Sequence, residues 1–261
     1  AWPASVALLA LSVTATLFAG AAYLERVHGW DRTTARFASM PGAFSAVVVM
    51  AANSAADMPR VVLAQSLRIF TLVLLMPPLI SLLAPGTPTA AQASSVMNSS
   101  VTNSPMTNRP GETLLVFAAA CLFAGLLRAL RVPAGILLGA MLASVALHAS
   151  GIVQGRFPPP LVIAGFVATG AVIGARFRGA NLALLARTAP GALVSILIAL
   201  AISAGFAFAG AQLLGMPFGK TWLAYAPGGV EAMAAMALAL RLDPAFVGAH
   251  HVLRILGLNV A

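Results

Sequence analysis

Acidic residues are scarce in this chain: six Asp and Glu stand against fifteen Lys and Arg, and charged residues make up only 8% of its 261 positions. Soluble domains carry a charge at about a quarter of their positions, so this low content excludes an ordinary soluble domain. Hydrophobic residues reach 60%, and the mean hydropathy is +0.95. We therefore expect an all-α integral membrane protein, a polytopic helical bundle, because helices satisfy their own backbone hydrogen bonds in lipid.

Metal-ligating residues are also few. The single cysteine, Cys121, excludes an internal disulfide and lies in an apolar run, where we expect a small packing residue. His250 and His251 are adjacent, so on a helix they would point about 100° apart and do not suit one shared metal ion. Hydrolase, kinase and dinucleotide motifs are lacking. We expect no metal, no cofactor and no enzyme activity.

The net charge of +9 raises the question of nucleic-acid binding. The basic residues, however, occur singly or in pairs between apolar runs, which is typical of loop charges that orient membrane spans. The expected partners are therefore the lipid bilayer and a small solute or ion, and not nucleic acid. Self-association into a homo-oligomer stays open.

Two stretches of the chain match when one is shifted by 186 positions. The segment PGAFSAVVVMAANSAADMPRVVLAQSLRIF (41–70) aligns without a gap to PGGVEAMAAMALALRLDPAFVGAHHVLRIL (227–256), and ten of the thirty positions are identical. The identities include Pro41 with Pro227, Asp57 with Asp243 and Arg68 with Arg254. This predicts an internal duplication of a membrane unit.

Uncharged runs long enough to cross the bilayer recur along the chain, since about 20 apolar residues span ~30 Å of hydrocarbon. Candidate spans, some of them short, are 1–24, 61–84 (interrupted only by Arg68), 113–127, 132–150, 161–175 and 188–219. Two further segments, 37–56 and 220–240, carry Pro-Gly sequences that interrupt a helix. We expect these two segments to be broken or re-entrant helices.

The domain organisation follows from the duplication. Residues 1–84 form the C-terminal part of membrane repeat 1, and residues 113–261 form membrane repeat 2 with a truncated end. Residues 85–112, rich in Ser, Thr, Asn and Pro, form a flexible linker. Repeat 1 lacks its beginning and repeat 2 lacks its end, so we expect that the chain is a piece of a longer protein.

Basic loops predict the orientation of the spans. The loops at 128–131 and 176–178 carry two arginines each and should face the cytoplasm. The loop at 25–36 carries three arginines and should face it too, whereas its aligned counterpart at 211–222 should lie on the other side. Equivalent loops on opposite sides predict inverted repeats.

The breaks supply the first candidate site residues. Gly42, Gly228 and Gly229 would leave half-helix ends that offer N–H or carbonyl groups to an ion. Glu231 lies four residues after Pro227, and a carboxylate at bilayer depth costs on the order of 3 kcal/mol, so it is a functional candidate. The alternative is a helix-end residue that faces interfacial water. Ser45 occupies the equivalent position in repeat 1.

The helices that follow supply the other candidates. Asp57 and Asp243 are most simply N-caps, with ion binding as the alternative. Arg68 and Arg254 should face the protein interior, an interface or a carboxylate, for which Glu231 is the natural candidate. Gln65 aligns with His251, which suggests a shared hydrogen-bonding role, and a proton-linked step at either histidine stays open.

The motif pair PGA…ADMPRVVLAQSLR and YAPGGVEAM…LDPAFVGAHHVLRI resembles the AbrB family of bacterial inner-membrane proteins. The resemblance covers the chain except for the linker, and it implies a duplicated membrane unit and a multi-pass location in the inner membrane. It also implies two labels, regulator of gene expression and, for some members, ammonia monooxygenase. The residues themselves favour a secondary transporter with a site between the repeats, with a membrane regulator as the alternative and a monooxygenase last, because copper or iron ligands are missing.

Overall fold

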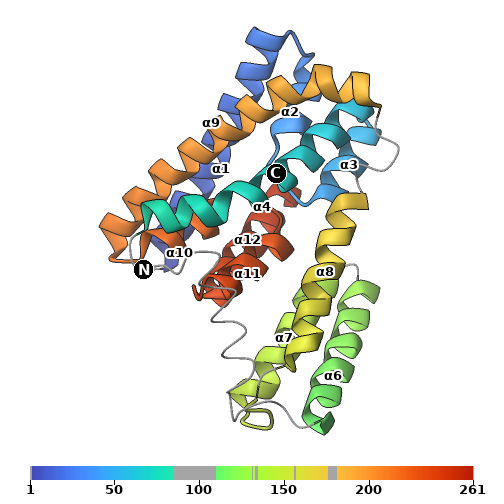
Figure 1. The fold of residues 1–261 in the computed structure, drawn as a ribbon, viewed down its shortest axis with the longest axis vertical. Helices are drawn as coiled ribbons and strands as arrows, with labels where there is room; N and C mark the ends of the chain where they lie inside the picture. Colours follow the sequence, from blue (N-terminus) through green and yellow to red (C-terminus); the bar gives the residue numbers. More distant parts are fainter. Residues whose placement is uncertain are drawn as a thin grey trace. The chain divides into compact units, whose positions relative to one another are not determined.

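The computed structural model describes residues 2–84, 110–130, 132, 135–155, 157–175 and 181–260. The side chains of Ser45, Leu137, Pro159, Ile173, Glu231, Asn259 and Val260 lie outside the described part. Nearly all of the predicted linker lies outside it too, although Pro110–Glu112 already belong to a helix. Every regular element within these ranges is an α-helix (Figure 1), which confirms the all-helical expectation.

The helices follow one another along the chain with short connections. They are α1 (Trp2–His28), α2 (Arg32–Ser39), α3 (Phe44–Ala52), α4 (Met58–Leu83), α6 (Pro110–Ala129), α7 (Gly135–Ala149), α8 (Pro159–Ala175), α9 (Leu182–Leu214), α10 (Phe218–Tyr225), α11 (Val230–Ala239) and α12 (Pro244–Val260). Four of them, α1, α4, α6 and α9, are long and apolar enough to cross a membrane. The chain is therefore a helical protein with four candidate membrane spans.

Short polar motifs set the ends of these helices. Asp31 caps α2 through a hydrogen bond from the Thr34 N–H, and Asn181 caps α9 in the same manner. Gly215 ends α9 in the left-handed conformation at φ 64°, which glycine adopts without a Cβ clash. Helix α4 continues through Pro77 and Pro78 to Leu83.

The helix bounds repeat along the chain with the same shift of 186 positions that aligns the sequence. Helix α2 at 32–39 corresponds to α10 at 218–225, and the starts of α3 and α4 correspond to those of α11 and α12. The ends of α1 and α9 correspond as well, and each is followed by a glycine at φ 64°, Gly29 and Gly215.

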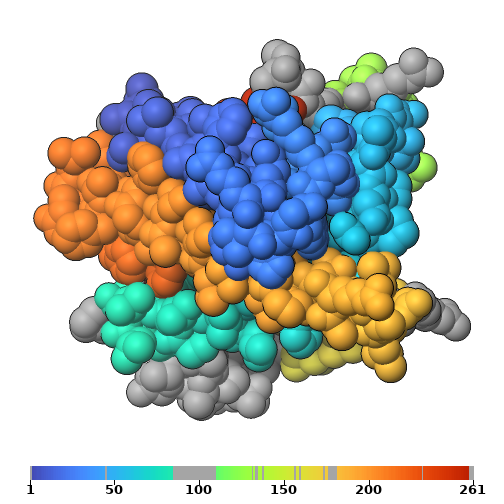
Figure 2. Space-filling model, turned by 90° about the horizontal axis from the view of Figure 1, so that it is seen from above, coloured from blue at the N-terminus to red at the C-terminus, as the bar shows by residue number. Residues whose placement is uncertain are grey.

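The described residues divide into two compact units, each described here by itself. Residues 1–93 and 169–261 form the first unit, in which α9 packs against α1, α4 and α10. Figure 2 shows α9 in orange between the blue α1 and α2 and the teal α4. Apolar side chains of α4, among them Leu72, Met76 and Ile80, share a buried core with Leu223 of α10 and Met233 of α11.

The second unit, residues 94–168, includes α6, α7 and the first part of α8. Helices α6 and α7 approach so closely at Gly139 that an added Cβ would lie 2.4 Å from the Ala124 nitrogen. Most of α6 is exposed, and Cys121 is exposed with it. The expectation that Cys121 is a packing residue is therefore wrong, because an apolar helix meant for lipid keeps apolar side chains on its outer face.

Candidate functional site

The two Pro-Gly sequences interrupt helices as predicted. Helix α2 ends at Ser39 and α3 begins at Phe44, while α10 ends at Tyr225 and α11 begins at Val230. We call α2, α3 and their connection broken segment 1 (residues 32–52), and α10, α11 and their connection broken segment 2 (residues 218–239). The last carbonyls of α2 and α10 lack intrahelical partners, so each break needs donors from elsewhere.

Two buried arginines supply those donors. Arg68 on α4 donates from Nη1 to the Met40 carbonyl and from Nη2 to the Gly42 carbonyl at 3.3 Å. Arg254 on α12 donates from Nη1 to the Ala226 carbonyl at 2.7 Å and from Nη2 to the Gly228 carbonyl. The two arginines are 3% and 4% exposed and make the same contacts 186 positions apart. Both face the protein interior, which was one of the expected placements.

The partners of these arginines differ from the carboxylate that the sequence suggested. The contacts that the structure describes for both guanidinium groups are main-chain carbonyls at the negative end of a short helix. A guanidinium can satisfy two carbonyls at once because its donors form a fixed fork. The side chain of Glu231, the proposed carboxylate partner, and that of Ser45 lie outside the described residues.

One helical turn before each arginine, a second polar side chain reaches the same broken segment. Gln65 donates from Nε2 to the carbonyls of Phe37, Ala38 and Met40. His251 donates from Nε2 to the Leu223 carbonyl at 2.9 Å, and Leu223 is 186 positions from Phe37. The shared hydrogen-bonding role of Gln65 and His251 is therefore confirmed. Within the described part of the chain, Gln65 Oε1 and His251 Nδ1 have no hydrogen-bond partner.

The aspartates are N-caps, as the simpler interpretation held. Asp57 accepts a hydrogen bond from the Arg60 N–H at the start of α4, and Asp243 accepts one from the Phe246 N–H at the start of α12.

Each aspartate position is also tied to the start of a broken segment. The Asp57 N–H donates to Thr34 Oγ1, and Lys220 Nζ donates to Asp243 Oδ2 at 2.9 Å. Thr34 and Lys220 are again 186 positions apart. The aspartates therefore lie beside the first turns of α2 and α10, away from the breaks.

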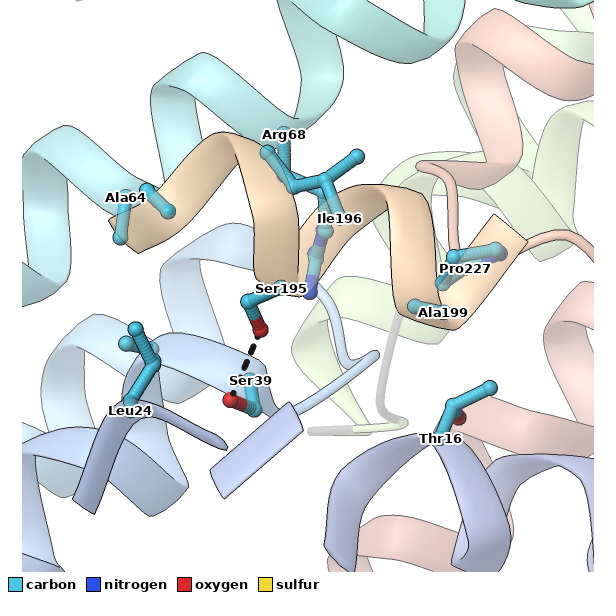
Figure 3. A pocket seen from close by; sticks show the side chains of 11 residues that line it. Thr16, Leu24, Ser39, Ala64, Arg68, Ser195, Ile196, Ala199 and Pro227 are labelled. Atoms are coloured by element: carbon cyan, nitrogen blue, oxygen red, sulfur yellow. Dashed lines mark hydrogen bonds between the residues drawn. The ribbon is translucent and has the colours of Figure 1, made fainter. Parts of the chain in front are cut away.

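The breaks themselves border a common hollow in the first unit (Figure 3). Its polar lining consists of Arg68, Ser39 at the end of α2, Ser195 of α9 and Thr16 of α1. Pro227 of the second break completes it on another side, and the remaining lining side chains are apolar. The hollow measures about 10 Å³, close to the room that one water molecule needs.

A second buried polar cluster lies near broken segment 2. His250 Nδ1 donates to the Phe246 carbonyl, which leaves Nε2 to accept from Ser5 Oγ at 2.8 Å. Tyr225, the last residue of α10, contacts Ser5 at both its hydroxyl and its carbonyl. This cluster ties α1, α10 and α12 together.

Sequence reasoning missed the hydroxyl residues of the hollow and of this cluster. One signal was available: Ser39 and Tyr225 occupy equivalent positions directly before the two breaks. Ser5, Thr16 and Ser195 lie in apolar runs that carry no comparable signal. Among the residues that the structure describes, no group of three His, Cys, Asp or Glu side chains could hold a metal ion.

The fold and these contacts define a helical protein with candidate membrane spans and two broken helices stabilised by buried arginines. The chain belongs to the AbrB family, since the family model described as "Transition state regulatory protein AbrB" matches residues 1–261. It is 28% identical over 254 residues to an Escherichia coli (strain K12) protein named "Putative regulator AbrB", covering 97% of this chain and 70% of that protein. No solved structure matches the chain.

Proposed function

We propose that this AbrB-family protein is a secondary transporter of a small solute or ion, with its site where the two broken segments meet between two inverted repeats. The observation that carries the proposal is the pair of breaks: each is held by an arginine at equivalent positions, and both border one hollow. Broken helices and polar groups at a repeat interface are what a binding site within the membrane requires.

The duplication has support beyond the sequence alignment. Helix bounds, glycine ends, aspartate caps and the arginine contacts all recur with the shift of 186 positions. Chance similarity of apolar segments would not reproduce hydrogen bonds between equivalent atoms, such as Arg68 to Met40 and Arg254 to Ala226.

The contacts along α4 support a re-entrant course for broken segment 1. Thr34 lies at the level of Asp57, the first break lies at the level of Arg68, and α3 then leads back to Asp57. From Asp57 to Arg68 the rise is about 16 Å, at about 1.5 Å per residue. That is half of the ~30 Å hydrocarbon thickness. The segment therefore enters and leaves at one end of α4, with its break at mid-depth.

Broken segment 2 has the same three levels along α12. Lys220 lies at Asp243, Leu223 at His251, and the second break at Arg254. In inverted repeats the two segments would enter from opposite faces of the membrane, and their breaks would meet in the middle. Such non-helical backbone persists at membrane depth only where protein or a water-filled cavity covers it.

The location and partners follow from this proposal. Helices α1, α4, α6 and α9 place the chain in the cell inner membrane as a multi-pass protein, with lipid and a small solute as partners and no nucleic acid. Enzyme activity is not part of the proposal. Stoichiometric copper or iron in purified protein would instead revive the monooxygenase label.

The second candidate function is a membrane-embedded regulator of gene expression. The family description and the name of the Escherichia coli relative favour it. A regulator needs a soluble partner that receives its signal. A pull-down with intact protein that recovers a stable soluble partner, together with absence of transport, would favour this candidate.

Reconstituted protein tests the transport proposal. Proteoliposomes on a solid-supported membrane should give currents or counterflow with at least one of sodium acetate, sodium succinate, sodium glutamate and choline chloride, or uptake of labelled alanine. Glu231→Gln should alter the rate or its pH dependence, whereas Glu25→Gln at the end of α1 should not. Folded protein that moves none of these solutes faster than empty liposomes contradicts transport of these classes. An unchanged Glu231→Gln profile removes that residue from the site.

A further inference from the structure

We propose that the hollow between the two breaks binds an anion, either a halide or one oxygen of a carboxylate, with Arg68 as its counter-charge. The inference deepens the proposed function and rests on it for the link to transport. Binding itself can be measured on purified protein, whether or not the protein transports anything.

The charge of the lining favours an anion. All the residues that line the hollow are described, and Arg68 is the charged one among them; the other polar ones, Thr16, Ser39 and Ser195, are hydroxyl residues. Figure 3 shows the Arg68 side chain extending past Ile196 towards Ser195. Hydrogen bonds to neutral carbonyls leave the positive charge of a guanidinium in place. A cation in this hollow would be repelled, and an anion attracted, in a medium of low dielectric constant.

A second cation strengthens this field. Arg254 lies close enough for the charge of Arg68 to act on it, and it is 96% buried by its 4% exposure. Its Nε has no hydrogen-bond partner within the described residues, and no described carboxylate forms an ion pair with it. Two neighbouring buried cations repel each other, so a bound anion would lower the energy of both.

The hydroxyls provide donors at the same place. Ser39 Oγ and Ser195 Oγ lie 3.5 Å apart, so at most one of the two hydroxyl hydrogens is used between them. The other is available to a ligand. Gly20 on α1 keeps this place open, because a Cβ there would lie 2.8 Å from Ser195 Oγ and 3.0 Å from Ser39 Oγ. Thr16 donates to the Val13 carbonyl and is not needed for the site.

The size of the hollow limits what enters. About 10 Å³ holds one atom of the size of a water oxygen, so a carboxylate would place a single oxygen there unless the breaks move apart. A halide would need a smaller displacement. The two sources share the chemistry of a small, negatively charged acceptor and differ in the room that they need.

Equilibrium binding on the full chain in detergent tests the proposal. Labelled chloride and labelled acetate, each with sodium as the counter-ion, are measured by dialysis, with labelled sodium as the cation probe. We expect saturable binding of chloride or acetate and no saturable binding of sodium. Ser195→Ala should weaken anion binding about tenfold or more, because hydrogen bonds to charged groups contribute about 1.5–3 kcal/mol. Thr188→Ala, a buried hydroxyl on the same helix outside the hollow, should leave it unchanged.

Arg68→Lys keeps the charge but not the fork, so it should retain weakened binding, whereas Arg68→Gln should abolish it. If Arg68→Gln does not fold, Ser195→Ala and Gly20→Ala decide alone, and both should weaken binding. Binding of chloride alone assigns the site to a halide, and binding of acetate assigns it to carboxylates. Absence of saturable anion binding, saturable sodium binding, or anion binding that Ser195→Ala leaves intact each overturns the proposal. Anion binding without transport would retain this site and contradict the proposed function instead.

Discussion

The two broken segments share their backbone contacts and differ in their side chains. At both breaks an arginine donates to carbonyls at equivalent positions, and both following helices begin with an aspartate cap. Between cap and break, Gln65 donates to three carbonyls where His251 donates to one. The contacts that hold the shape are therefore the same in both copies, while the titratable chemistry lies in the second copy alone.

The second copy also has neighbours that the first lacks. The Ser5, His250 and Tyr225 cluster packs on broken segment 2, and the positions 186 residues away carry Gly191, Ala64 and Ser39, which cannot form it. At the start of the segment, the Lys220–Asp243 ion pair replaces the neutral contact of Thr34. We infer that segment 1 serves mainly as a fixed wall and that segment 2 carries the groups that respond to pH.

Removing either arginine should have the largest effect, and a similar one in both copies. Arg68→Leu and Arg254→Leu each leave two carbonyls without a buried donor, and the free energy of unfolding should fall by about 2–5 kcal/mol. Unfolding in mixed micelles with increasing dodecyl sulfate measures it, with exposed Arg187→Leu as the control. A loss in one copy only would contradict the equivalence of the two breaks.

The polar cluster should matter in the second copy alone. Ser5→Ala leaves the His250 and Tyr225 side chains short of a buried partner, at a cost of about 1–3 kcal/mol. Ser12→Ala, on the same helix, removes a buried hydroxyl that has no described partner and should be near neutral. The same unfolding assay compares them, and equal effects of the two variants would remove the cluster from the account.

The glycines of the two breaks should tolerate alanine unequally. A Cβ at Gly42 would lie 2.9 Å from Val47 Cγ2, and a β-branched side chain has little freedom to move. A Cβ at Gly228 meets Met233, whose unbranched side chain can change rotamer. We expect Gly42→Ala to cost about 1–3 kcal/mol and Gly228→Ala less, by thermal unfolding of the purified protein. The reverse order would show that segment 1 is the more adaptable one.

The smallest effect should come from the ion pair of segment 2. Burial raises the pKa of Asp243, but hydrogen bonds from Phe246 and Lys220 and the Lys220 charge outweigh it, so the pKa lies below its usual range. A lowered folded-state pKa contributes stability above the unfolded value of about 3.9 and loses it as the pH falls through the folded value. The pair is partly exposed, so Lys220→Met should cost about 0–1 kcal/mol at pH 7. Melting temperatures between pH 3 and 7 measure this, and a Lys220→Met profile that still falls like the parent's at low pH would assign the loss elsewhere.

The breaks and their buried arginines were predictable because proline, glycine and a charge within an apolar run are local signals. The caps at Asp57 and Asp243 were predictable for the same reason. The carbonyl partners of Arg68 and Arg254 were not, because a main-chain acceptor has no signature in sequence. Ser39 and Ser195 meet only through tertiary packing between α2 and α9, 156 positions apart.

The re-entrant course of the broken segments is tested most directly by labelling from known sides of the membrane. In a Cys121→Ala background, Arg32→Cys and Ala55→Cys place single thiols at the exposed beginning and end of broken segment 1. A membrane-impermeant maleimide is then applied to sealed vesicles of either orientation. The account predicts that both thiols react from the same side, and reaction from opposite sides would show that the segment crosses the bilayer and would contradict it.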